Sequence, residues 1–265
     1  MCLVKVCFRD TMAGIMNQEL IYIFGKHAVA EALTHRGELI RELYIEHGFT
    51  DSAIFERLPR AKVLPQVLNA KRLPGGLRGD AVHQGIIAGI SVRDLMVSYA
   101  DFIPNCPVTP QTCLLILGEV QDPHNVGAVI RSAAAFGVSA VLIPPHNQSP
   151  VTGTVVKVSA GMAFRIPLVE ISNVNATLSD LKERGFWVYG LAGEGSTSVT
   201  AEQFTKPTAF VVGNEGSGLR AKTREMCDIL VNIPMHPRCE SLNAAASAAV
   251  VLYAWSAQQG GALKA

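Results

Sequence analysis

Residues 122–131 read Asp-Pro-His-Asn-Val-Gly-Ala-Val-Ile-Arg, and this stretch indicates the fold more clearly than any other part of the chain. It joins an apolar run at 114–117 to a helical pattern at 126–136. Two comparable junctions follow, Gly-Asn-Glu-Gly-Ser-Gly-Leu at 213–219 and Ser-Leu-Asn at 241–243. Small and turn-forming residues at such junctions are typical of the edge where an α/β sheet exposes backbone donors and acceptors to a ligand. The three junctions therefore predict a ligand site at one edge of a sheet.

Apolar runs alternate with helical patterns through the C-terminal half of the chain. The pattern predicts strands at 114–117, 140–143, 186–191, 209–212 and 229–233, and helices at 126–136, 175–184, 219–226 and 242–255. Strands that are apolar at nearly every position are covered on both faces, which is typical of a parallel sheet wrapped by helices. The fold class predicted for this half is therefore α/β with a largely parallel sheet.

The N-terminal half has a different organisation. A helical pattern at 26–34, strands at 42–46 and 84–90, and a turn-rich loop at 73–80 predict a smaller α/β domain. Pro104, Pro107 and Pro110 each remove an amide donor, so they predict a linker between the halves. The expected division is a disordered N-terminal extension at 1–19, a small domain at 20–96, a linker at 97–112 and a larger domain at 113–265.

Composition restricts the classes of protein that the chain can represent. With 265 residues, of which 49% are hydrophobic and 17% charged, the chain can bury a substantial core. The formal net charge is only +1, so contact with nucleic acid would have to come from local patches. The six cysteines include no C-x-x-C pair, and charged residues interrupt the first ten positions. We therefore expect a cytoplasmic protein with reduced thiols, without metal, export signal or membrane span.

The three junctions carry a family resemblance. Residues 122–131, 212–219 and 233–235 with 241–243 resemble the three signature motifs of the SpoU/TrmH methyltransferases, which methylate RNA ribose 2′-hydroxyls with S-adenosylmethionine. Residues 23–33 and 81–88 resemble the RNA substrate-binding domain of members that act on large-subunit ribosomal RNA. The resemblance implies a guanosine of 23S rRNA as substrate, a deep trefoil knot of the SPOUT type and a homodimer formed through the knotted domain.

The same resemblance implies a set of site residues. Those expected to bind the cofactor are Leu191, Ala192, Gly193, Gly213, Asn214, Gly218, Ile233, Met235, Leu242 and Asn243. Those expected to act in catalysis are Arg131, Asn125, Glu215, Ser241 and Asn243. A guanidinium has a pKa above about 12, so Arg131 is expected to grip the target phosphate and polarise the hydroxyl, with the proton leaving to phosphate oxygen or water.

Simpler roles stay open for several of these residues. Asn125 could be a helix cap, as could Ser241 or Asn243, and Glu215 could orient Arg131 or be an ordinary loop carboxylate. His124 is expected to make a turn contact and not to act as a general base. Lys71, Arg72 and Arg78 could contact phosphate or be solvated surface charges.

Two other functions remain as alternatives at this stage. One is a 2′-O-methyltransferase acting on tRNA, and the other is a non-catalytic RNA-binding or ribosome-assembly factor that keeps the fold. A nucleoside triphosphatase is disfavoured because the glycine loop at 213–218 lacks the lysine and hydroxyl that complete a P-loop. A nicotinamide dehydrogenase is disfavoured because no G-x-G-x-x-G motif opens the first βαβ unit.

Overall fold

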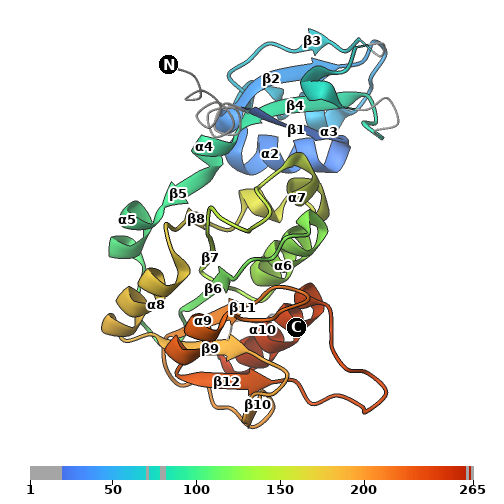
Figure 1. Cartoon of the computed structure of the whole chain (residues 1–265). Helices are drawn as coiled ribbons and strands as arrows, with labels where there is room; N and C mark the ends of the chain where they lie inside the picture. Colours follow the sequence, from blue (N-terminus) through green and yellow to red (C-terminus); the bar gives the residue numbers. More distant parts are fainter. Residues whose placement is uncertain (1–19, 70–71, 78–81, 261–262, 264–265) are drawn as a thin grey trace, which may run out of the picture. The chain divides into compact units, whose positions relative to one another are not determined.

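The computed structural model describes residues 20–69, 72–77, 82–260 and 263. The chain forms two compact units, Met1–Leu95 and Met96–Ala265, which are coloured blue to green and green to red in Figure 1. The extension expected at 1–19 and the basic residues Lys71 and Arg78 lie outside the described residues.

The first unit is built on a four-stranded sheet with the order β1-β4-β2-β3. β4 (Ile86–Ser91) pairs antiparallel with β1 (Leu20–Phe24) and β2 (Ile40–Ile45), and β3 (Gln66–Val67) adds parallel to β2. α2 (Lys26–Arg36) buries Ala28, Val29, Ala32 and Leu33, a spacing that puts four apolar side chains on one helical face. Short helices α3 (Ser52–Phe55) and α4 (Val92–Leu95) and 3-10 turns at Gly37–Leu39, Leu58–Arg60 and Pro74–Gly76 complete the unit. The small α/β architecture expected for this region is confirmed.

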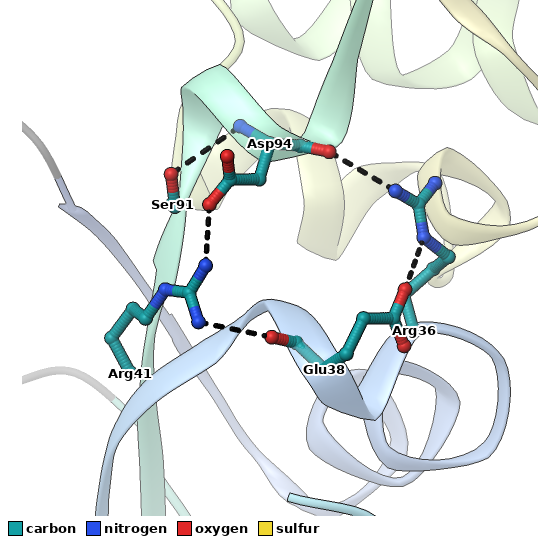
Figure 2. Close-up of polar contacts among 5 residues, drawn as sticks. All are labelled: Arg36, Glu38, Arg41, Ser91 and Asp94. Carbon is teal, nitrogen blue, oxygen red and sulfur yellow. Dashed lines mark hydrogen bonds and ion pairs between the residues drawn. The ribbon is translucent and has the colours of Figure 1, made fainter. Parts of the chain in front are cut away.

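A network of polar contacts attaches α4 to the rest of the first unit (Figure 2). Asp94 accepts from Arg41 at 2.6 Å through its carboxylate and from Arg36 at 3.0 Å through its backbone carbonyl. Arg36 also pairs with Glu38 at 2.9 Å, and the Asp94 backbone N–H donates to the hydroxyl of Ser91 at 3.3 Å. The hydrogen bond from Arg41 lowers the pKa of the Asp94 carboxyl. Exposed pairs of this kind contribute only about 0–1 kcal/mol each, so their main effect is to orient α4 after β4.

The second unit is built on an eight-stranded sheet with the order β10-β12-β9-β11-β6-β7-β8-β5, and every pairing in it is parallel. Its strands are β5 (Met96–Ser98), β6 (Cys113–Leu117), β7 (Ala140–Ile143), β8 (Leu168–Glu170), β9 (Trp187–Leu191), β10 (Thr197–Ser198), β11 (Thr208–Val212) and β12 (Ile229–Asn232). The central strands β6, β7 and β11 are buried at every position. The predicted parallel α/β sheet is confirmed.

Two groups of helices accompany this sheet. α6 (Pro123–Ala135) packs against both α7 (Gly153–Val158) and α10 (Ala244–Gln258). α8 (Val174–Glu183) contacts α9 (Ala221–Met226) and shares a buried cluster with alternate residues of β6 and β7, among them Leu114 and Leu142. A 3-10 turn at Met162–Phe164 follows α7. None of the described helices is long and apolar enough to cross a lipid bilayer.

The segment 97–112 differs from the linker that its prolines predict. Met96–Ser98 forms the edge strand β5, which pairs with β8, and α5 (Tyr99–Phe102) and a 3-10 turn at Ile103–Asn105 follow. Ile103 and Cys106 join the buried cluster of the second unit. Pro104 is tolerated because it lies in the first turn of a 3-10 helix, where no amide donor is needed. The segment is therefore part of the second unit.

Gly127 supplies a stability prediction, because it lies where α6 meets α7. A Cβ atom at this position would stand 2.7 Å from the Cβ of Val158 and 2.9 Å from the carbonyl oxygen of Val155. We expect Gly127→Ala to lower the free energy of unfolding by about 1–3 kcal/mol, as overpacked cores do, in urea denaturation. Ala135→Ser, at an exposed site on the same helix, should stay within about 0.5 kcal/mol. An unchanged denaturation midpoint for Gly127→Ala would show that the two helices can separate freely.

Candidate active site

A pocket of about 350 Å³ opens where β9, β11 and β12 end. Three loops form it, one after each strand, and the start of α10 contributes Ala244 and Ser247. Because the carboxyl ends of parallel strands meet at one edge of the sheet, segments far apart in the sequence come together here. Leu191, Ile233, Met235 and Leu242 give the pocket apolar walls.

The loop after β11 is closed by its own asparagine. The Oδ1 atom of Asn214 accepts from the backbone N–H groups of Gly216 at 2.9 Å and Ser217 at 3.1 Å. Asn214 and Gly218 also exchange two backbone hydrogen bonds of 3.0 Å. A Cβ atom on Gly213 would lie 2.4 Å from the carbonyl carbon of Gly218, so the loop can close only with glycine at position 213.

Glu119, which follows β6, holds this loop from outside. Its carbonyl oxygen accepts from Asn214 Nδ2 at 3.0 Å, and its carboxylate pairs with Arg220 Nη2 at 2.5 Å. The backbone of Glu119 has φ of 74°, a left-handed conformation that is unfavourable for a residue with a side chain. Sequence reasoning missed Glu119, because a glutamate after Gly118 carries no signal of the tertiary contacts that hold it.

A line of amide and carboxylate groups borders the pocket. Asn125 Nδ2 on α6 donates to Glu215 Oε1 at 2.9 Å, and Asn243 Nδ2 donates to Asn125 Oδ1 at 2.8 Å. Asn125 is only 8% exposed, whereas Glu215 and Asn243 are exposed, so both bonds are partly buried. The structure thus joins three of the predicted catalytic residues, which come from three separate segments.

The capping alternatives are resolved by the same contacts. Asp122, and not Asn125, is the N-cap of α6, since its side chain accepts from the backbone of His124 at 2.8 Å. Asn243 caps α10 through Oδ1, which accepts from Ala245 at 2.8 Å, while its Nδ2 contacts Asn125. Asn243 therefore has both the capping role and the site contact, and Ser241 is not a cap.

The remaining predicted site residues divide into two groups. Those that line the pocket are Leu191, Ala192, Gly193, Gly213, Asn214, Glu215, Gly218, Ile233, Met235, Ser241 and Leu242. Arg131 is exposed on α6 and is not among the lining residues, and no described residue pairs with its guanidinium. Within one chain, the structure brings the predicted cofactor loops together and leaves Arg131 outside the pocket.

The charges around the pocket favour a ligand with a positive group. Three carboxylates line it, those of Glu194, Glu215 and Glu240, against the single guanidinium of Arg224. Arg224 is hydrogen-bonded to Glu194 and lowers the pKa of that carboxyl, so Glu215 and Glu240 keep uncompensated charge. In the described part of the chain, no group of three or more His, Cys, Asp or Glu residues is placed to hold a metal ion.

Fold and pocket together define an α/β protein of the class that binds a small ligand at the carboxyl edge of its sheet. Within this class, the chain belongs to the SpoU rRNA Methylase family, whose model matches residues 112–253. Residues 22–93 match a second model, described as RNA 2′-O ribose methyltransferase substrate binding. The family expected from the three motifs is confirmed.

Individual relatives agree with this assignment. The chain is 39% identical to the 23S rRNA (guanosine-2′-O-)-methyltransferase RlmB of Xanthomonas campestris over 90% of its length and 96% of that protein's. It is 38% identical to the protein of the same name from Neisseria meningitidis, over 89% of this chain and 94% of that one. Among solved structures, the SpoU methyltransferase AviRb from Streptomyces viridochromogenes, in complex with AdoMet, has a TM-score of 0.78 at 24% identity and covers 95% of this chain and 94% of its own. The fold class is therefore the SPOUT type that the resemblance implies.

Glu119 supplies a prediction about the loop after β11. Glu119→Gln removes the charge that pairs with Arg220 and keeps the backbone contact with Asn214, so the loop should lose part of its anchoring. We expect the affinity for S-adenosylmethionine, measured by calorimetry, to fall about two- to fivefold, as for the loss of a partly exposed ion pair. Glu183→Gln, at an exposed position on α8, is the matched control and should bind normally. Equal affinities for the two variants would rule out Glu119 as an anchor of the loop.

Proposed function

We propose that this protein transfers a methyl group from S-adenosylmethionine to the ribose 2′-hydroxyl of a guanosine in 23S rRNA, in the cytoplasm. Relatives with that activity in their names share 38–39% identity with the chain over nearly its whole length. The observation that carries the proposal is the line Asn243–Asn125–Glu215, which joins the three motifs at the border of the pocket formed after β9, β11 and β12.

The residues of the pocket fit this cofactor. S-adenosylmethionine supplies an electrophilic methyl group on a cationic sulfonium, and the carboxylates of Glu215 and Glu240 provide negative charge for such a group. Leu191, Ile233 and Leu242 offer apolar surface of the kind an adenine ring needs. Gly213, Gly216 and Gly218 let the backbone of the loop approach a ligand without a Cβ atom in between.

The chain's own residues must position a weak nucleophile and stabilise the alkoxide that develops on it. Asn125 orients Glu215 by donating to one of its carboxylate oxygens, which leaves the other oxygen for substrate or for a guanidinium. In this proposal Arg131 grips the target phosphate and polarises the 2′-hydroxyl, and the proton leaves to phosphate oxygen or water. Glu215 orients Arg131.

The position of Arg131 connects this chemistry with the homodimer that we also propose. α10 leaves Val250 and Tyr253 on its surface, 38% and 55% exposed, and the Tyr253 ring lies edge-on to Phe136 at the end of α6. An apolar patch on two adjoining helices supports self-association. Arg131 is exposed on α6 and lies outside the pocket of its own chain. In a homodimer, Arg131 of each chain could therefore reach the pocket of the other chain.

The alternatives have less support. A tRNA enzyme leaves unexplained why residues 22–93 match a separate substrate-binding model in a chain so similar to 23S rRNA enzymes. A non-catalytic assembly factor leaves unexplained the intact line of Asn125, Glu215 and Asn243 beside the pocket.

The proposed function predicts where a labelled methyl group will appear. The purified chain with tritium-labelled S-adenosylmethionine should label a 23S rRNA transcript and leave bulk tRNA unlabelled. Mapping by resistance to alkaline hydrolysis should place the label on the 2′-oxygen of a guanosine, because a methylated 2′-oxygen cannot attack the neighbouring phosphate. Label in tRNA alone would support the tRNA enzyme, and donor binding without transfer to any RNA would support the assembly factor.

Arg131 gives a prediction that separates catalysis from donor binding. Arg131→Ala should reduce methyl transfer about a hundredfold or more, the usual effect of removing a group that stabilises a developing oxyanion, with donor affinity nearly unchanged. Arg165→Ala, at an exposed position of the same unit, should retain activity. Asn243→Ala should weaken donor binding as well, because it removes both the cap of α10 and the contact with Asn125.

Mixed dimers extend this test to the assembly. If Arg131 serves the partner's pocket, a dimer of one Arg131→Ala chain and one Asn243→Ala chain contains one intact site and should regain activity. A dimer without regained activity would place Arg131 in the pocket of its own chain. A chain that sediments as a monomer while it transfers methyl groups would refute the dimer.

A further inference from the structure

A second hollow, of about 510 Å³, lies on the first unit and belongs to neither the donor pocket nor its loops. Its walls include Tyr22, Glu42 and Tyr44 from the sheet, with Val67 of β3 and Arg72 of the following loop. None of the catalytic or cofactor residues discussed above takes part in it. Its size is within the range of pockets that bind small organic groups.

Strand register brings its polar side chains together. Tyr22 on β1 and Glu42 on β2 both pair with Gly89 of β4, which lies between them. A Cβ atom on Gly89 would stand 3.2 Å from the Tyr22 ring and 3.3 Å from the Cβ of Glu42, so the two side chains meet over the space that glycine leaves. The Tyr22 hydroxyl donates to Glu42 Oε2 at 2.8 Å.

Tyr44 completes the arrangement from two positions further along β2. Its hydroxyl donates to the same Glu42 Oε2 at 2.9 Å, so both phenolic hydrogens point at one carboxylate oxygen. Burial, followed by the bond to Glu42, raises the pKa of Tyr22 to about 12, which keeps this phenol a neutral donor at ordinary pH. The described residues offer no hydrogen-bond donor to the other oxygen, Oε1.

The edge that results presents only acceptors to a ligand. Glu42 contributes Oε1, and each phenol contributes the lone pairs of an oxygen whose hydrogen is already committed. Val67, 75% exposed, provides apolar surface beside this edge. Arg72 lines the same hollow, is exposed, and makes no ion pair with any residue that the structure describes.

We propose that this hollow binds one unpaired guanine of the RNA substrate, with its N1–H and 2-amino groups donating to Glu42 and to a tyrosine oxygen. Among the four RNA bases, guanine alone has two adjacent donors on its Watson–Crick edge, whereas adenine, cytosine and uracil each have a single donor group there. Unpaired bases are the usual targets of sequence-specific RNA recognition, and aromatic side chains commonly line their pockets. Arg72 contacts a phosphate next to the bound guanosine. The proposal rests on RNA being the substrate, as proposed above.

The test compares short RNA hairpins that differ at one unpaired loop position, guanosine, inosine or adenosine, with all other loop nucleotides uridine. Binding to the full chain is measured by fluorescence anisotropy at one fixed salt concentration. Guanosine should be preferred over adenosine about five- to hundredfold, the discrimination of a good bidentate base contact. Inosine, which lacks the 2-amino group, should bind with intermediate affinity.

Variants assign the preference to the hollow. Glu42→Gln replaces one acceptor by a donor and should reduce the preference for guanosine to less than about twofold, since a mismatched edge loses most of the discrimination. Glu56→Gln, an exposed carboxylate of the same unit, changes the charge equally and should keep the preference. Arg72→Ala should weaken all three hairpins alike and reduce the dependence of log K on log salt concentration by about one unit.

Each contrary outcome has a distinct meaning. Equal binding of guanosine and adenosine hairpins, absence of binding to any hairpin, or a preference that survives Glu42→Gln in a folded variant overturns the guanine site. If circular dichroism shows that Glu42→Gln does not fold, Tyr44→Phe tests the site instead. This variant keeps the aromatic ring and removes one phenolic oxygen, so the preference for guanosine should fall in part. Failure of methyl transfer with the guanosine preference intact refutes the proposed function and leaves an RNA-binding protein with this site.

Discussion

The buried side chain of Asn125 is the contact on which the rest of the site depends. It joins α6, the loop after β11 and the start of α10, segments that lie 90 and 118 residues away from it along the chain. A buried amide without partners costs about 1–3 kcal/mol, so its two hydrogen bonds favour one arrangement of the three segments. The residues between β12 and α10 form no strand or helix, and those from 235 to 243 are exposed. The course of this segment therefore depends on the hydrogen bond from Asn243 and on the packing of α10 against α6.

Around this contact, the pocket combines a stiff loop with a more open one. The loop after β11 is held from inside by Asn214 and from outside by Glu119, whose left-handed backbone carries strain of about 1–3 kcal/mol. That strain persists because the carbonyl and the carboxylate of Glu119 both have partners on the loop. The segment with Met235 and Leu242 has few such contacts and is free to adjust around a ligand. A preformed backbone loop opposite an apolar wall with few fixed contacts suits a ligand that must enter and leave in every catalytic cycle.

Much of the fold could be predicted from the sequence, and the exceptions have physical reasons. The strand expected at 140–143 is β7 with the same bounds, since a fully buried parallel strand leaves a clear apolar run. β8 has only three residues and follows Pro167, so no run marks it, and α7 is too short to show a helical period. The segment with three prolines belongs to the second unit because β5 pairs with β8 and Ile103 and Cys106 are buried in its core, contacts that the prolines do not reveal. The cofactor loops could be predicted because their motifs are local, but Glu119 and the exposure of Arg131 depend on tertiary contacts that no local pattern encodes.

The charge of the chain shapes how it must recognise RNA. With a net charge of only +1, long-range attraction to phosphate contributes little, and the donor pocket adds local negative charge where the acceptor ribose has to arrive. Binding energy must therefore come from short-range contacts that a correct RNA makes and an incorrect one does not. The edge formed by Glu42 and the two tyrosines provides such a contact, because it presents only acceptors. It repels phosphate and binds favourably only to a base whose donors match these acceptors. Because the overall attraction between this protein and nucleic acid is weak, specific short-range contacts must select the RNA. The same contacts must also hold the RNA beside a donor pocket that is lined by carboxylates.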